Sequence, residues 1–181
     1  MDLHLLRETS NIAVYYDADN DWLFVDWRGV LTLPLTQECC LLLAECLLDR
    51  PYTRILNSNQ NVTDFTRNVP NWLHTEFLPL LRHTSIEYLA WVYSPNMLLN
   101  PFIDKLVAKV EVPVVNLFDD VELAASWLLH TRFHYLSNTP KPCNAAKHCE
   151  LVKHAQAMAD GLGRPLHYTQ PYLMPSLRKT A

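Results

Sequence analysis

Residues 86–93 have the sequence Ile-Glu-Tyr-Leu-Ala-Trp-Val-Tyr, and this short stretch decides the fold class. Its apolar side chains follow one another without interruption from Leu89 to Val92. A strand with one face in water would alternate apolar and polar residues, whereas an unbroken apolar run is typical of a strand buried on both faces. Such a strand needs helices on both sides, so the stretch predicts an α/β domain.

The first strands are expected near the N-terminus. Segments 12–16 and 22–27 are rich in β-branched and aromatic residues, and the residues between them, Asp17–Asp21, favour turns. This pattern predicts a β-hairpin that ends near Gly29. The strands of the hairpin are antiparallel, because a short turn reverses the direction of the chain.

Helices and strands alternate over the following residues. Pro34 favours the start of a helix, and apolar residues at three- and four-residue spacing continue this helix over 34–49. The further elements expected are a buried strand at 53–56, a helix from 68, the strand at 86–93, a helix near 100–109, a strand at 112–118 and a helix from 119. The order β-β-α-β-α-β-α-β-α predicts a mixed, mainly parallel sheet of about five strands, flanked by helices.

Two local features modify this outline. The polar run Asn57-Ser58-Asn59-Gln60-Asn61 follows the strand at 53–56 and predicts a loop. Pro79 lies inside the helix that begins near residue 68, and it lacks the N–H that a helix interior requires. We therefore expect this helix to kink or to end early.

The C-terminal part differs in composition from the rest of the chain. Pro140 and Pro142 stop any continuing helix, and residues 145–160 then predict an amphipathic helix followed by a proline-containing tail. We therefore divide the chain into an α/β domain at 1–134 and an extension at 135–181. An isolated helix of this length is marginal in water, so we expect it to dock on its own domain or on a second copy, and a homodimer is favoured.

Composition and charge exclude several classes of protein. The chain has 181 residues and a formal net charge of −4, which provides no basic surface for nucleic acid. No apolar segment is long enough to span a membrane, and the N-terminus carries Asp2, Arg7 and Glu8 where a secretion signal would be apolar. We therefore expect a cytoplasmic protein with reduced cysteines.

The sequence lacks motifs for catalysis and for cofactor binding. It has only three glycines and no Gly-x-Ser-x-Gly sequence, which excludes the α/β-hydrolase elbow and the phosphate-binding loops. Cysteines and histidines gather in one region without the close spacing of a zinc site; they are His130, His134, Cys143, His148, Cys149 and His154. We therefore expect no metal ion and no other cofactor.

Several aromatic and turn residues fall in the order and spacing of a known bacterial family. They are Trp27-x-Gly29, Phe77 with Pro79, Ala90-Trp91-Val92, and Phe118-Asp119 with Ala125-Ser126-Trp127-Leu128. Over about residues 10–130 the chain resembles the STAS-like, or SpoIIAA-like, domains. The resemblance implies a small sheet covered by helices and a non-enzymatic role in regulation or in protein binding.

The resemblance also draws attention to Ser58. In the anti-sigma-factor antagonists that share this fold, a serine near the start of a helix is phosphorylated to control partner docking, and Ser58 is its counterpart here. The acidic residue and the glycine usual around that serine are absent. We therefore expect that Ser58 is not a constitutive phospho-switch.

The candidate binding site is the crevice at the carboxyl ends of the strands, where ligands bind in open α/β sheets. The loop after residue 56 should meet the turn at 94–96 there. The residues expected to form the site are Ser58, Asn59, Asp64, Arg67, Trp72 and His74.

Two alternatives to a protein-binding module stay open. One is a carrier of a small apolar ligand or a lipid, which would use an apolar crevice near Trp72 and Trp91. The other is an enzyme whose catalytic residues are dispersed along the chain, so that no motif reveals them. A carrier should copurify with apolar material, whereas an enzyme should bring titratable groups together in a cleft.

Overall fold

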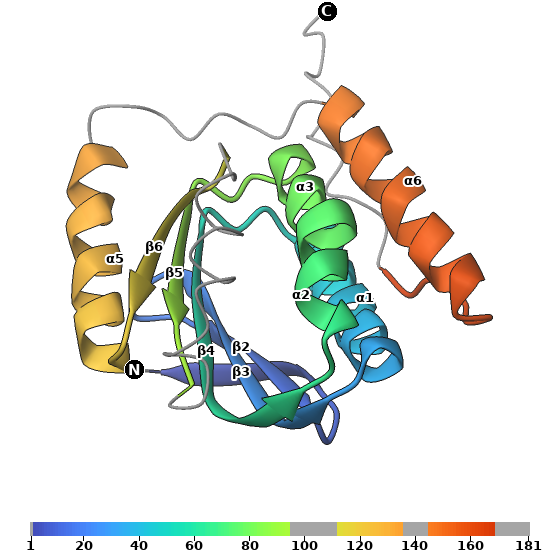
Figure 1. The fold of residues 1–181 in the computed structure, drawn as a ribbon. Coiled ribbons are helices and arrows are strands. Elements are labelled where there is room, and N and C mark those ends of the chain that lie inside the picture. Colours follow the sequence, from blue (N-terminus) through green and yellow to red (C-terminus); the bar gives the residue numbers. More distant parts are fainter. Residues whose placement is uncertain (1, 95–111, 136–144, 169–181) are drawn as a thin grey trace, which may run out of the picture.

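One sheet of six strands forms the centre of the computed structural model, which describes residues 2–94, 112–135 and 145–168 (Figure 1). The strands lie side by side in the order of the sequence. The sheet is antiparallel from the first strand to the third and parallel from the third to the sixth. The strands are β1 (Leu3–Glu8), β2 (Ile12–Asp17), β3 (Trp22–Leu31), β4 (Arg54–Phe65), β5 (Tyr88–Val92) and β6 (Val114–Phe118).

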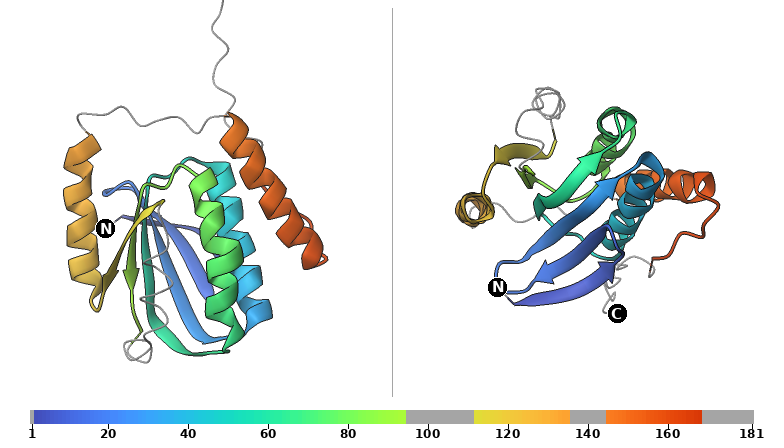
Figure 2. Two further views of the ribbon diagram at one scale, coloured as in Figure 1. Left: turned by 45° about the horizontal axis from the view of Figure 1, so that its top comes forward. Right: turned by 60° about the horizontal axis from the view of Figure 1, so that its bottom comes forward.

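Helices cover both faces of this sheet, as the apolar run at 86–93 predicts (Figure 2). α1 (Leu33–Asp49) and the helical segment 68–83 lie on one face, and α5 (Val121–Tyr135) lies on the other. α6 (Ala145–Gly161) packs against α1. The fold is therefore the expected mixed, mainly parallel α/β class with a C-terminal helical extension. None of the described helices is long and apolar enough to cross a membrane.

The strand β5 confirms the prediction of a central strand. Leu89 and Trp91 belong to the apolar core that includes α1, whereas Ala90 and Val92 belong to the core that includes α5. All of these side chains are buried, and β5 pairs in parallel with β4 on one side and β6 on the other. The strand therefore has no face in contact with water.

The predicted loop at 57–61 is wrong, because β4 continues through these residues. The side chains of Asn57, Asn59 and Asn61 form hydrogen bonds with the neighbouring strands. Trp27 Nε1 donates to Asn57 Oδ1 at 2.8 Å, and both groups are buried. Asn59 Nδ2 donates to Val92 O at 2.8 Å. A polar run can form a buried strand when its side-chain hydrogen bonds are made across the sheet.

One further difference from the predicted elements concerns a strand. β1 is not among the expected elements, and it makes the sheet one strand larger than predicted. It pairs antiparallel with β2, and most of its side chains are exposed, so its sequence lacks the alternation that marks a half-buried strand. The helix predicted near 100–109 lies outside the described residues.

The helix that begins at Asn68 changes type along its length, in the region where Pro79 predicts a kink. Its parts are α2 (Asn68–Trp72), the π-helix η1 (Leu73–Phe77), α3 (Leu78–Leu80) and the 3-10 helix η2 (Leu81–His83). The N–H of Leu78 donates to the carbonyl of Leu73, five residues earlier, so this turn is wider than in an α-helix. Pro79 has no N–H with which to continue the regular pattern.

The helix α6 docks on α1 of its own chain through small and apolar side chains. Leu151 and Ala155 are buried in one cluster with Ala44 of α1. The segment after α6 adds a polar contact, in which the N–H of His167 donates to Glu45 Oε1 at 2.8 Å. The docking expected for this helix is thus made within the chain, while the division of the sequence into two domains stays a prediction.

Candidate ligand-binding pocket

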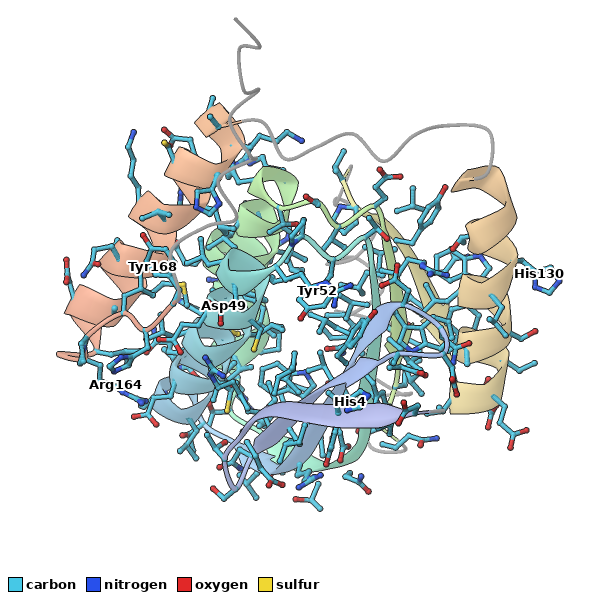
Figure 3. The ribbon with its side chains drawn as sticks, turned by 180° about the vertical axis from the view of Figure 1, so that it is seen from behind. His4, Asp49, Tyr52, His130, Arg164 and Tyr168 are labelled. Carbon is cyan, nitrogen blue, oxygen red and sulfur yellow. The ribbon has the colours of Figure 1, made fainter. Side chains whose placement is uncertain are left out.

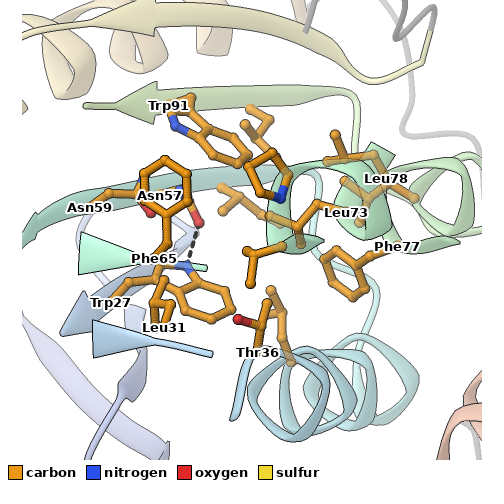
Figure 4. A pocket seen from close by; sticks show the side chains of 16 residues that line it. Trp27, Leu31, Thr36, Asn57, Asn59, Phe65, Leu73, Phe77, Leu78 and Trp91 are labelled. Carbon is orange, nitrogen blue, oxygen red and sulfur yellow. Dashed lines mark hydrogen bonds between the residues drawn. The ribbon is translucent and has the colours of Figure 1, made fainter. Parts of the chain in front are cut away.

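An apolar pocket lies between the sheet and the helices on one of its faces (Figure 4). The strands β3, β4 and β5 contribute one wall, and α1 and the helical segment 68–83 contribute the other. The volume of the pocket is about 50 Å³, counted as the space open to the centre of a water molecule. The lining residues are Trp27, Leu31, Thr36, Leu43, Ile55, Asn57, Asn59, Phe65, Val69, Pro70, Leu73, Phe77, Leu78, Leu81, Leu89 and Trp91.

The lining is almost entirely apolar, and none of the described lining residues is charged. Thr36 uses its hydroxyl within α1, where Oγ1 donates to Thr32 O at 2.9 Å. The amide of Asn59 donates to Val92 O, as described above. A cavity with this composition holds water poorly, because a buried water needs two to four polar partners. The pocket is therefore suited to an apolar group.

Two hydrogen-bond donors on the sheet wall lack a partner among the described residues. An indole N–H can only donate, so the bond from Trp27 Nε1 to Asn57 Oδ1 fixes the orientation of the Asn57 amide. The Nδ2 of Asn57 then has no acceptor, and Trp91 Nε1 also has none. Their residues are 6% and 8% exposed. Each buried donor without a partner lowers the stability of the fold by about 1–3 kcal/mol.

The two asparagines of the pocket lie at its strand end, where the apolar side chains of Trp27, Leu31 and Phe65 also lie. Figure 4 shows Trp91, Asn57 and Asn59 at one end, on the strands. Leu73 and Phe77 lie at the other end, together with other apolar side chains of the helical segment. Apolar side chains therefore line both ends of the pocket.

The entrance of the pocket is marked by two side chains. Of the described lining residues, Phe65 and Leu73 are partly exposed, whereas the others are buried. Phe65 ends β4, and Leu73 begins the π-helix η1. The pocket therefore reaches solvent between the end of β4 and the start of η1. Single π-helical turns are frequent at functional sites, and this one contributes both Leu73 and Phe77 to the pocket.

The residues expected from the sequence do not come together in one site. Asn59 lines the pocket, whereas Asp64 and Arg67 are exposed beyond it. Trp72 lines a second groove, with a volume of about 270 Å³ on the same measure, between α6 and the helices α1 to α3. His74 is partly buried, and its Nδ1 has no partner among the described residues.

Ser58 lies inside β4, away from any helix start, and is only 2% exposed. Its Oγ accepts a hydrogen bond from the N–H of Gln60 at 3.4 Å. A phosphate on this side chain would bring a charge of about −1.5 to −2 into a packed sheet. We therefore still expect that Ser58 is not a constitutive phospho-switch.

Several pocket residues were not predicted as part of a site from the sequence. Asn57 lies in the stretch that was predicted to be a loop. No pattern in the sequence indicates Phe65 as a pocket residue. Trp27 was expected in the hairpin strand at 22–27, and packing in the core was favoured for it over a place in a ligand pocket. The signal that could have found them is the pairing of a long polar run with a tryptophan-rich sheet, because buried amides need donors and acceptors from their neighbours. Trp91, which was expected both in the core and at an apolar crevice, does line the pocket.

The cysteines of α1 are unsuited to nucleophilic chemistry. Cys39, Cys40 and Cys46 are all buried. Burial raises the pKa of the Cys39 thiol to about 11 and that of the Cys46 thiol to about 12, and it also raises the pKa of Cys40. At neutral pH these thiols are therefore almost entirely protonated, whereas the thiolate is the reactive form.

The cysteines and histidines near the C-terminus do not form a metal site within the described part of the chain. No three His, Cys, Asp or Glu side chains there lie close enough to hold an ion. His130 points away from the sheet on the outer side of α5, with Nδ1 2.7 Å from Ser126 O (Figure 3). Cys143 and the side chain of His134 lie outside the described residues.

Fold and pocket together define an α/β protein with a helix-covered sheet and a small apolar pocket. The structure is similar to a solved structure of an uncharacterized protein from the DUF3478 family, from Shewanella loihica, described as having a SpoIIAA-like fold. The two chains are 18% identical, the match covers 69% of this chain and 99% of that chain, and the TM-score is 0.48. No family model and no curated protein matches the sequence.

Proposed function

We propose that this protein is a non-enzymatic binding module that takes a small, mainly apolar molecule into the pocket under η1. The observation that carries the proposal is the pocket itself, which is lined almost entirely by apolar side chains together with Thr36, Asn57 and Asn59. Ligand sites in proteins have this character: they are mostly apolar and contain a few polar groups that orient the ligand.

The size of the pocket limits the ligand. A buried water needs roughly 10–15 Å³ on the measure used here, so about 50 Å³ corresponds to a few water molecules. This space suits one small ring or a short alkyl chain. A longer chain would have to extend through the entrance between Phe65 and Leu73.

The lining supports binding rather than catalysis. General acid–base chemistry needs a titratable side chain within hydrogen-bond reach of the substrate. The described lining contains no carboxylate, imidazole, thiol, amine or phenol, and the hydroxyl of Thr36 is engaged by Thr32 O. An enzyme with a dispersed site would therefore have to use another part of the molecule.

A bulky side chain at the entrance should prevent binding. We expect Leu73→Trp to weaken the affinity for toluene at least tenfold, because Leu73 is partly exposed at the entrance and an indole there would occupy the access route. Affinity would be measured by NMR titration of the wild type and the variant. The matched control is Leu42→Trp on α1, which is also partly buried but does not line the pocket. The proposal is wrong if toluene causes no saturable shift at pocket residues of the wild type.

A protein partner is the second candidate, and the exposed edge strand β1 favours it. Leu3 is 38% exposed and Leu5 is 53% exposed on this strand, and such edges readily pair with another strand. We propose a second copy of the chain as this partner, with the two β1 strands antiparallel about a two-fold axis. Light scattering should then show a dimer for the wild type and a monomer for Leu5→Glu. Leu123→Glu, at an exposed position on α5, should leave the dimer intact.

A further inference from the structure

We infer that His83 and His154 form a pH-sensitive contact, which keeps the helix α6 docked at neutral pH and weakens its docking at acidic pH. This device concerns the position of α6 and is independent of the ligand proposed for the apolar pocket. Release of the helix would uncover an apolar surface, because α6 buries side chains of α1 and α3. The residues of that cluster are Ala44, Leu48, Leu80, Leu151 and Ala155.

The two imidazole rings stack on each other where α6 meets the helical segment 68–83. Their centroids are 5.3 Å apart, and the angle between the ring planes is 23°. His83 ends the 3-10 helix η2 and is partly buried, whereas His154 lies on α6 and is exposed. α6 packs against both α1 and η2, and Figure 1 shows it on the outer side of α1 and α3. The stacked pair is therefore part of the contact that docks α6.

Close packing does not replace this contact along the neighbouring part of α6. The groove of about 270 Å³ runs between α6 and the helical segment, and Trp72, Glu76 and His154 belong to its lining. The carboxylate of Glu76 attracts a protonated His154 and so opposes release. Glu76 is exposed, however, so solvent screens this attraction. The loss of the stacked pair would therefore weaken the docking of α6 on this side.

The stacked arrangement is suited to neutral rings. His154 Nδ1 lies 2.7 Å from Glu150 O, and a carbonyl can only accept, so Nδ1 carries a hydrogen and Nε2 is the atom that gains a proton. Histidine is the side chain whose charge ordinarily changes between about pH 5 and 8. A proton on each ring would place two positive charges at the ring separation of 5.3 Å. Like charges at this distance repel, and the repulsion ends when α6 moves away.

The surroundings of His83 favour its neutral form while α6 is docked. Burial, the ring of His154 and the positive charge of Arg82 lower the pKa of His83 below its ordinary value of 6.5, and Lys147 acts in the same direction. Glu150 acts in the opposite direction but is outweighed. When α6 leaves, His154 and Lys147 leave with it, so the pKa of His83 returns toward its ordinary value. The undocked form therefore binds a proton more tightly, and docking loses stability as the pH falls below 6.5.

Hydrogen exchange of the full chain tests the inference, at about pH 7.5 and about pH 5.5, on the two sides of the ordinary histidine pKa. Protection is expressed relative to the unprotected rate at the same pH, which removes the pH dependence of the exchange chemistry. We expect the protection of the α6 amides to fall about fivefold at the lower pH, because the charged rings repel in the docked form. The amides of β5 should keep their protection, since only α6 is released.

Three glutamine variants identify the groups that take up the proton. His83→Gln and His154→Gln remove one titrating ring each, so the change in α6 protection between the two pH values should shrink to less than about twofold. The matched control is His148→Gln, because His148 also lies on α6 but outside the stacked pair. It should keep the response of the wild type. The measured quantity is the change with pH, so a weaker dock at neutral pH in a variant does not affect the comparison.

Three results would overturn the inference. The first is equal protection of α6 at both pH values in the wild type. The second is a full response in His83→Gln and His154→Gln, which would mean that another group titrates. The third is a parallel loss of protection in β5, which would indicate acid unfolding of the whole chain. None of these results bears on the apolar pocket, which is tested by the binding of toluene.

Discussion

Replacement of Trp91 by alanine is expected to lower the free energy of unfolding by about 3–5 kcal/mol, as for other buried aromatic side chains. Trp91 is 8% exposed and belongs to the larger apolar core, where it lies on the central strand β5. The substitution removes its apolar contacts and enlarges the pocket beside it, and the two effects add. Equilibrium unfolding in urea, monitored by far-UV circular dichroism, would measure the change.

The control for this prediction is Trp91→Phe, which keeps most of the apolar area. Trp91→Phe should lower the free energy of unfolding clearly less than Trp91→Ala does, because the ring still fills the space between the sheet and the helices. Loss of the unpartnered indole N–H should offset part of the decrease in the free energy of unfolding. An unfolding midpoint of Trp91→Ala that equals that of the wild type would contradict the assignment of Trp91 to the core.

The elements that bury apolar faces could be predicted from the sequence. β5 appears as an unbroken apolar run, and α1 appears as apolar residues at helical spacing. The hairpin of β2 and β3 is visible in its two β-branched segments and in the turn residues between them. Each of these signals is local, because the period of the side chains that face the core is set by the geometry of the element itself.

The polar half of β4 could not be predicted in this way. Asn57 and Asn59 favour turns when only neighbouring residues are considered. Their burial depends on partners that are distant in sequence, since Trp27 lies 30 residues from Asn57 and Val92 lies 33 residues from Asn59. Hydrogen bonds of this kind override the local preference of these residues for turns, and no periodic pattern in the sequence indicates such bonds.

The candidate site was predicted only in part. An apolar crevice was expected near Trp72 and Trp91, and Trp91 lines the pocket. Trp72 lies in the other groove, beside α6. Val69, Leu73 and Phe77, which follow one another at four-residue spacing, line the pocket, whereas Trp72 lies one position off this spacing.

A second large effect is expected at Arg54, a charged side chain that is only 3% exposed. Its guanidinium connects three parts of the structure. One nitrogen donates to Asn20 O at 2.6 Å and to Asp21 O at 3.2 Å, in the turn between β2 and β3. The other donates to Leu128 O at 3.3 Å, in α5. The guanidinium carbon also lies 5.6 Å from the ring centroid of Trp22, within cation–π distance.

We expect Arg54→Leu to lower the free energy of unfolding by about 3 kcal/mol, because hydrogen bonds from a charged donor contribute about 1.5–3 kcal/mol each. Arg54→Lys should lose part of this stability, since one ammonium cannot reproduce the forked geometry of the guanidinium. Urea unfolding would measure both variants. Hydrogen exchange should show faster exchange in the turn at 17–21 and in α5, the elements that Arg54 connects.

Arg50 provides the matched control for Arg54, because it also contacts Asp21 but from the surface. Its side chain is 50% exposed, and one of its nitrogens lies 3.5 Å from the Asp21 carboxylate. Exposed ion pairs of this kind contribute at most about 1 kcal/mol, so Arg50→Leu should have a small effect. Similar losses for the two variants would mean that the bonds of Arg54 to backbone carbonyls do not stabilise the fold. A clear difference would identify the start of β4 as the point at which the hairpin turn and α5 are joined.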